Sequence, residues 1–157
     1  MSTISLVKNF DGSSSDSKPL LNLLYSEIDG YIYFTKGTYE SGDYNDELWR
    51  TDGTELGTTL IKEINTTSYS SIEGMYAYGG YLYFSADNGS SGKELWKSDG
   101  TKDGTVLIKD INTGNGNSNP KYFTQRGSYI YFSATDDTNK AGLWKTDGTE
   151  SGTTLVK

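Results

Sequence analysis

Short apolar segments separated by turn residues recur along the whole chain, and their pattern predicts β-strands. The segments 31–34, 81–84 and 129–132 read Tyr-Ile-Tyr-Phe, Tyr-Leu-Tyr-Phe and Tyr-Ile-Tyr-Phe. A strand with one face in water would carry a polar residue at every second position, and these segments do not. We therefore expect them to be covered on both sides. Because no window shows the apolar spacing of an amphipathic helix, the chain is predicted to be all-β.

A turn signal stands directly before each of these segments. The signals are Asp29-Gly30, Gly79-Gly80 and Gly127-Ser128, and each follows another apolar run, at residues 20–25, 72–78 and 121–125. Glycine supplies the positive φ that a two-residue turn requires, so a dipeptide of this kind between two apolar runs predicts a β-hairpin.

A longer motif follows each hairpin and makes the chain a repeat. Residues 94–109 read Glu-Leu-Trp-Lys-Ser-Asp-Gly-Thr-Lys-Asp-Gly-Thr-Val-Leu-Ile-Lys, and close copies occupy residues 47–62 and 142–157. The three tryptophans fall 47 and 48 residues apart. Each unit therefore holds four short strands, which is the pattern of a β-propeller blade. We predict one repeat domain over residues 1–157, with three four-stranded antiparallel blades at about 19–64, 72–111 and 120–157.

The repeated motif resembles the bacterial ELWxxDGT repeat family, which is marked by the Glu-Leu-Trp and Asp-Gly-Thr elements at residues 94–96 and 99–101. The third copy departs from it, since Ala141-Gly142 stands where the other copies have Asp46-Glu47 and Lys93-Glu94. The resemblance implies propeller-like blades and large, often secreted or cell-surface proteins. It implies no catalytic residues.

Three blades are fewer than the four to eight that close a propeller, so two apolar blade faces would be left uncovered. The chain could be cut from a longer array, two chains could close a six-bladed ring, or the arc could stack into a larger assembly. Closed symmetry is the usual solution for identical chains, and we expect a homodimer. Residues 4–10 resemble the last strand of a repeat. Residues 1–18 are therefore predicted to form an extra outer strand and a loop, either displaced or pairing as a fifth strand.

Composition restricts the function. The chain lacks cysteine and histidine, which removes thiolate chemistry and the usual general base, so we expect no enzyme and no cofactor. The net charge of −7 makes nucleic acid and anionic membranes poor partners. No run of 18 apolar residues and no signal peptide occur in the sequence, and the cellular location is left open.

Connections that differ between copies should gather at one end of the blades, where recognition is usually built. The longest is 37–46. The residues predicted to bind a ligand are Tyr39, Asp43, Tyr44, Asn88, Asp136 and Asp137.

Two functions are compatible with this pattern. The first is a non-catalytic binding or structural scaffold, with a carbohydrate or a protein as ligand. The alternative is a lectin-like module with pockets between blades, and a glycoside hydrolase with paired carboxylates ranks third. The tryptophans could stack on sugars, although large aromatics in regular strands usually form the core. Asp52, Asp99 and Asp147 fit hydrogen-bonded turns better than calcium sites, which need more oxygen ligands.

Overall fold

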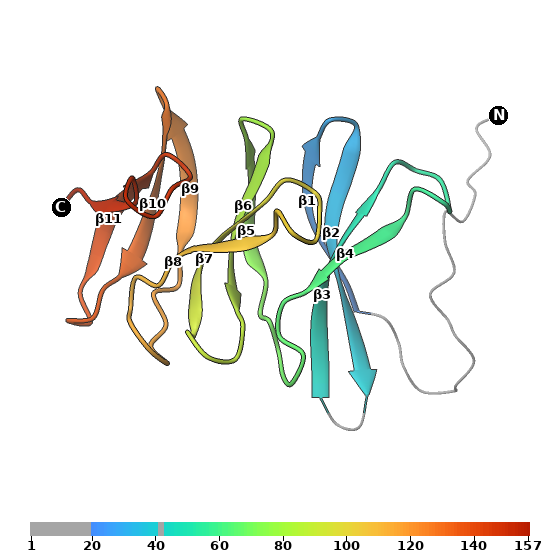
Figure 1. The fold of residues 1–157 in the computed structure, drawn as a ribbon, viewed down its shortest axis with the longest axis horizontal. Helices are drawn as coiled ribbons and strands as arrows, with labels where there is room; N and C mark the ends of the chain where they lie inside the picture. The colour runs from blue at the N-terminus through green and yellow to red at the C-terminus, as the bar shows by residue number, and fades with distance from the viewer. Residues whose placement is uncertain (1–19, 41–42) are drawn as a thin grey trace.

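The computed structural model describes the backbone of residues 20–40 and 43–157, and the side chains of residues 28–37 and 46–157. These residues form strands and turns without a helix, as the sequence predicts. Three antiparallel sheets, each of four strands in chain order, stand side by side in a row (Figure 1). The predicted strand at residues 4–10 and its loop lie outside the described residues.

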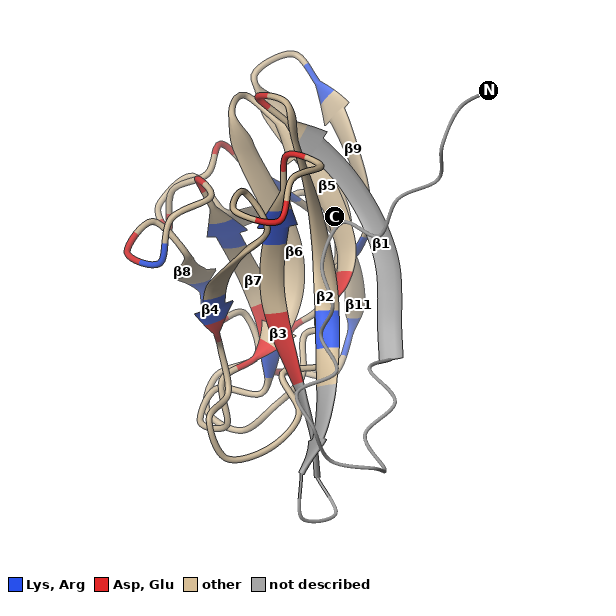
Figure 2. Cartoon of the chain, turned by 90° about the vertical axis from the view of Figure 1, so that its right-hand side faces the viewer, with Lys and Arg blue, Asp and Glu red and all other residues tan. Residues whose placement is uncertain are grey.

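The first sheet contains β1 (Leu20–Ile28), β2 (Tyr31–Glu40), β3 (Asp43–Thr51) and β4 (Thr59–Glu63). The second sheet contains β5 (Glu73–Tyr78), β6 (Tyr81–Asp87), β7 (Lys93–Ser98) and β8 (Val106–Lys109). The third sheet contains β9 (Lys121–Arg126), β10 (Tyr129–Thr135), β11 (Ala141–Thr146) and β12 (Thr154–Leu155). The strands β1 and β5 are in contact, as are β5 and β9, so the first strands of the three sheets lie together along one side of the row. The strands β4 and β8 lie on the opposite side (Figure 2).

The predicted hairpins are confirmed at the start of each sheet. Asp29 and Gly30 have φ values of 52° and 80°, and Gly79 and Gly80 have 60° and 79°. Positive φ at both central residues belongs to the two-residue turn whose twist matches that of the strands it joins. The local turn residues therefore favour the antiparallel pairing of the strands on either side of them.

Each Asp-Gly-Thr turn, at residues 52–54, 99–101 and 147–149, is held by a compact set of hydrogen bonds. In the second sheet, Asp99 Oδ1 accepts bonds from the Thr101 amide at 2.9 Å and the Thr101 hydroxyl at 2.7 Å. The Gly104 amide donates to Thr101 Oγ1 at 2.9 Å, and the Thr105 hydroxyl donates to the Thr101 carbonyl at 2.6 Å. The same bonds recur in the other two copies. The hydrogen-bonded turn predicted for these aspartates is thus confirmed.

The second sheet is packed on both faces. Against the first sheet it buries Leu82, Phe84, Ala86 and Trp96, which meet Tyr33, Leu48 and Ile61. Against the third sheet it buries Tyr83, Leu95 and Ile108, which meet Ile130, Phe132, Ala134 and Trp144. Two cores of the same composition therefore hold three sheets together, each made by the same positions of the repeat.

Burial along the central strands shows where the expectation of two covered faces holds. All residues from Leu82 to Ala86 in β6 are buried, as predicted. In β10, burial alternates from residue to residue, because only one face of the third sheet packs on a neighbour. Tyr131 on the other face is half-buried. The prediction is therefore correct for β6 and wrong for β10 in the single chain.

The tryptophans of the second and third sheets are part of the two hydrophobic cores. Trp96 and Trp144 are buried in the two clusters, which confirms the structural interpretation for them. Trp49 is half-buried, and its indole N–H donates to Glu47 Oε2 at 2.8 Å. The Trp49 ring also stacks near Phe34, with the centroids 6.4 Å apart.

Candidate functional surfaces

The strand order assigns the connections to two ends of the sheets. Because each sheet runs up and down in chain order, the two-residue hairpin turns and the Asp-Gly-Thr turns share one end. The connections between the second and third strands of each sheet, and those between sheets, share the other end. We call this second end the variable end. The predicted ligand-binding residues lie there, in three different sheets.

The hairpin of β2 and β3 is longer than its counterparts. In the second sheet the equivalent pairing ends at Asp87 and Lys93, which correspond to Gly37 and Asp46. In the first sheet, three more residue pairs follow: Thr38 with Asn45, Tyr39 with Tyr44, and Glu40 with Asp43. The prediction of a loop over 37–46 is therefore wrong for residues 37–40 and 43–46, which are in strands. Threonine and tyrosine favour strands, and this outweighs the polar composition of the segment.

Three of the predicted binding residues belong to this extension. Tyr39 and Tyr44 are directly paired across the two strands, and Asp43 pairs with Glu40. Their side chains lie outside the described part of the structure. The backbone places all three beyond the level at which the other hairpins end.

Asn88 and Asp136 hold their own connections together. Asn88 Oδ1 accepts bonds from the amides of Ser90 at 3.0 Å and Ser91 at 2.9 Å. Asp136 Oδ1 accepts bonds from the Thr138 amide at 2.8 Å and the Thr138 hydroxyl at 2.6 Å, and these bonds lower the pKa of Asp136. Both side chains thus stabilise turns at the variable end.

Asp137 joins two connections that are far apart in sequence. Its Oδ1 accepts a bond of 2.7 Å from the amide of Thr113, in the segment between the second and third sheets. Nearby, the Thr135 amide donates to the Ser118 carbonyl at 2.8 Å. The variable end of the third sheet is therefore held in place by the segment that precedes it.

Glu94 is a buried acid that the sequence does not distinguish from its counterparts in the motif. Its carboxylate accepts bonds from the Ile111 amide at 2.7 Å, the Ser118 amide at 2.9 Å and the Ser118 hydroxyl at 2.6 Å. Burial raises the pKa of Glu94 to about 7, against the effect of these bonds. Glu47 bonds Trp49 instead, and Gly142 has no side chain to offer, so the three copies use this position differently.

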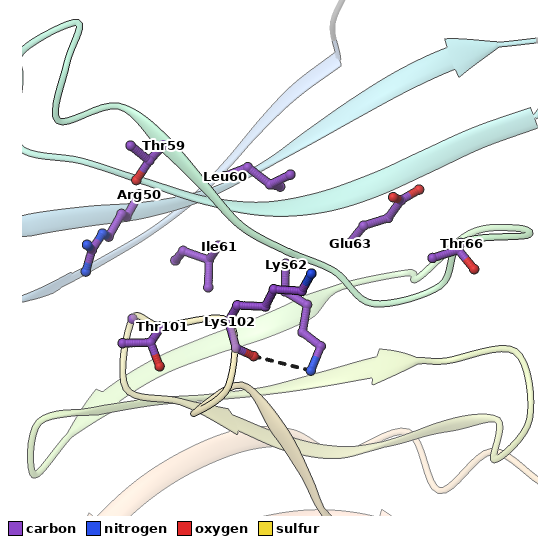
Figure 3. Close-up of a pocket in the computed structure, with 10 residues that line it drawn as sticks. Arg50, Thr59, Leu60, Ile61, Lys62, Glu63, Thr66, Thr101 and Lys102 are labelled. Atoms are coloured by element: carbon purple, nitrogen blue, oxygen red, sulfur yellow. Dashed lines mark hydrogen bonds between the residues drawn. The ribbon is translucent and has the colours of Figure 1, made fainter.

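A cavity of about 530 Å³ opens between the first and second sheets, on the side away from β1 and β5. Its walls are the end of β3, strand β4 and the Asp-Gly-Thr turn of the second sheet (Figure 3). Three cationic residues, Arg50, Lys62 and Lys102, and one acidic residue, Glu63, line it. No pattern in the sequence indicates this cavity, because Arg50 and Lys102 are brought together only by the stacking of two sheets.

A comparison with known protein families and with curated proteins finds no match for this chain. In the described part of the chain, no group of three or more acidic side chains is arranged to hold a metal ion. Those residues also contain no helix of the length and apolar character that crossing a membrane requires.

Proposed function

We propose that this chain is a non-catalytic binding and scaffold module of the ELWxxDGT type, built as an arc of three propeller blades, and that two copies close a six-bladed ring. One observation carries the proposal. The same tyrosine–glycine contact joins the first sheet to the second and the second to the third, and the end sheets carry a further tyrosine and a further glycine at the matching positions.

The contact joins a tyrosine of one sheet to a glycine of the next. The hydroxyl of Tyr33 in β2 lies against Gly100, so close that a Cβ at that glycine would collide with it. The hydroxyl of Tyr83 in β6 lies 2.7 Å from the Cβ position of Gly148. Both glycines are buried. The Asp-Gly-Thr turns of the second and third sheets thus each receive the tyrosine of the preceding sheet.

The remaining members of the series are Tyr131 in β10 and Gly53. The φ of Gly53 is 87°, against 86° for Gly100 and 90° for Gly148, so its turn has the same shape. Gly53 is nevertheless exposed, and no described atom lies within 4 Å of its Cβ position. A second copy that placed its Tyr131 against Gly53 would complete the series.

The outer face of the third sheet has the composition of a core. Leu143 and Val156 are 45% and 47% exposed, whereas their counterparts Leu95 and Ile108 are 0% and 6% exposed. Exposed apolar faces of this kind usually mark an interface. In the second sheet, Phe84 and Trp96 belong to the face that packs on Leu48 and Ile61 of the first sheet. These two residues of the first sheet are the counterparts of Leu143 and Val156.

The matching residues of the first sheet are Phe34 and Trp49, on the same chain. The two end faces therefore have the residue types of the two halves of this contact, and within one chain Phe34 is 4% exposed and Trp49 is half-buried. Contacts of this head-to-tail kind form a ring when the rotation closes, and two copies supply six blades, within the range of known propellers.

Solution mass tests the ring. Light scattering should give a mass near twice 17.3 kDa for the unaltered chain. Leu143→Arg should give a folded monomer, since it places a charge in the centre of the interface. Asn115→Arg adds the same charge in an exposed connection and should stay dimeric. A monomeric parent chain, or a larger assembly, would overturn the two-copy ring.

The scaffold presents the extended β2–β3 hairpin as its recognition element. The test replaces residues 38–45 with the chain's own short connection 88–92, which serves the same place in the second sheet. A glycan array should give signals with the parent chain that this variant loses while retaining its fold. Signals that survive the exchange would exclude the hairpin. An array without signals would favour the scaffold role over carbohydrate binding.

A further inference from the structure

We propose that the cavity between the first and second sheets binds a small acidic sugar of the hexuronate class, a ring carrying one carboxylate and several hydroxyl groups. We call this cavity the basic groove, lined by Arg50, Lys62 and Lys102 together with Thr59, Thr66 and Thr101. Both of its walls belong to one chain. The proposal is therefore independent of ring closure and of the hairpin at the variable end.

The repeat itself shows that the charge of the groove is not required by the fold. Lys102 follows the Asp-Gly-Thr turn of the second sheet, and the equivalent residues in the other copies are Glu55 and Glu150. All three turns make the same internal hydrogen bonds. Lys102 thus carries the opposite charge to Glu55 and Glu150. The hydrogen bonds of the turn are the same with either charge at this position.

A second difference lies on the opposite wall. Thr59 in β4 offers a hydroxyl to the groove, whereas the equivalent residue in β8 is Val106. The junction between the second and third sheets therefore has Glu150 and Val106 where the basic groove has Lys102 and Thr59. Thr154 repeats Thr59 in the third copy, so Lys102 is the difference that only this site carries. A difference at one site of a regular scaffold is a usual sign of recognition.

Positive charges outnumber negative ones in the groove, whose lining includes one acid, Glu63. In the described part of the chain, none of Arg50, Lys62 and Lys102 forms a salt bridge. The whole chain carries a net charge of −7, so a cavity lined by three cations and one acid is a local exception. A cleft with a net positive charge attracts a ligand of the opposite sign.

Two of the cations are already oriented by the fold. The Lys62 ammonium donates to the Thr105 carbonyl at 2.6 Å and to the Lys102 carbonyl at 3.4 Å, so one of its three protons is still available (Figure 3). The Arg50 guanidinium lies over the Tyr31 ring, 4.5 Å from its centroid. Lys102 is exposed and can turn toward a ligand.

The other lining residues indicate a sugar rather than a simple anion. Thr59 and Thr66 provide hydroxyl groups that can both donate and accept hydrogen bonds. The Thr101 hydroxyl already donates to Asp99 and accepts from Gly104, so it can accept one further bond. Leu60 is 46% exposed beside them and provides an apolar surface for the C–H groups of a ring. The volume of about 530 Å³ lies in the range of small-ligand sites. A carboxylate and hydroxyls on one ring match this lining.

Titration with glucuronate, followed by backbone NMR shifts, tests the proposal. We expect saturable shifts at Lys62, Thr66 and Thr101, with a dissociation constant on the order of 1 mM, typical of a small polar ligand. Lys102→Glu should weaken binding at least tenfold without loss of the folded spectrum. Lys140→Glu makes the same charge change on an exposed turn of the third sheet and should leave the affinity unchanged.

Two further titrations separate the parts of the ligand. Glucose has the ring without the carboxylate and should bind far more weakly, while sulfate has charge without hydroxyls and should also bind more weakly. Failure of glucuronate to bind, equal binding of glucose or sulfate, or an unchanged affinity in Lys102→Glu would each overturn the proposal. Added salt should weaken glucuronate binding, because the interaction is between charges near the surface.

Discussion

The hydroxyl of Ser118 donates a hydrogen bond of 2.6 Å to Glu94 Oε2, across 24 residues of sequence. Ser118 lies in the connection between the second and third sheets, and Glu94 lies in β7 of the second sheet. Both residues are 0% exposed. A buried acid therefore attaches the segment that leads into the third sheet.

The raised pKa of Glu94 predicts that stability falls as pH rises. An unfolded glutamate loses its proton near pH 4.5, whereas folded Glu94 keeps it until about pH 7. Between these values the folded state binds more protons, so raising the pH favours unfolding. The loss should reach at most about 3 kcal/mol. Urea unfolding at several pH values measures it.

Glu94→Gln is the control, because it keeps the shape but cannot titrate. The difference in unfolding free energy between parent and variant should change between pH 4.5 and 7. Since all other carboxylates are shared, their contributions cancel. A difference that stays constant over this range would show that Glu94 is ionised in the folded state throughout.

Gly104 and Asp99 should be coupled in stability. A Cβ at Gly104 would collide with the Asp99 carboxylate. We expect Gly104→Ala to cost about 1–3 kcal/mol through this overlap, and Asp99→Ala about 1–2 kcal/mol through the lost turn bonds. In the double variant the collision is absent, so the total should be less than the sum. Strict additivity in denaturant unfolding would contradict this account.

Local signals were enough to predict the hairpins and the Asp-Gly-Thr turns. Asp29-Gly30 fixes its turn through backbone conformation alone, and Asp99 finds its partners within two residues. Packing of the aromatic strands was predictable for β6, whose neighbours on both sides belong to the same chain. The prediction of two covered faces is wrong for β10, because the sequence of a strand does not say whether a second sheet packs on its other face.

Features that depend on sheets meeting each other could not be predicted. Glu94 stands in a polar-looking motif, and its burial follows from a connection that begins after the next strand. Arg50 and Lys102 line one cavity although 52 residues separate them. The sequence predicts Tyr39 and Tyr44 as binding residues of a loop, because the residues around them are polar, but the two tyrosines lie in paired strands.

Trp96 should stabilise the core between the first and second sheets through the volume of its ring and not through a hydrogen bond of its N–H group. The indole nitrogen is buried and has no hydrogen-bond partner among the described residues. Trp96→Phe should therefore cost about 1–2 kcal/mol, against about 3–5 kcal/mol for Trp96→Ala, which leaves a larger cavity. Thermal and urea unfolding compare the two. Equal losses would mean that the ring's contacts are not what stabilises this core.

Lys97 and Lys145 occupy equivalent positions, and comparing them separates contacts within the chain from contacts between copies. Lys97 Nζ donates to the Gly148 carbonyl at 2.7 Å and lies 5.0 Å from the Tyr81 ring centroid. Lys97→Met should cost about 1–3 kcal/mol at any protein concentration, since both sheets belong to one chain.

Lys145 lies over the Tyr129 ring at 4.5 Å, but the carbonyl equivalent to that of Gly148 is Gly53, at the other end of the row. In the proposed ring this acceptor comes from the second copy. The stability difference between the parent chain and Lys145→Met should therefore grow with protein concentration, because mass action populates the contact only in the dimer. A small difference that is independent of concentration, measured by thermal unfolding over a hundredfold dilution series, would show that Lys145 makes no contact between copies.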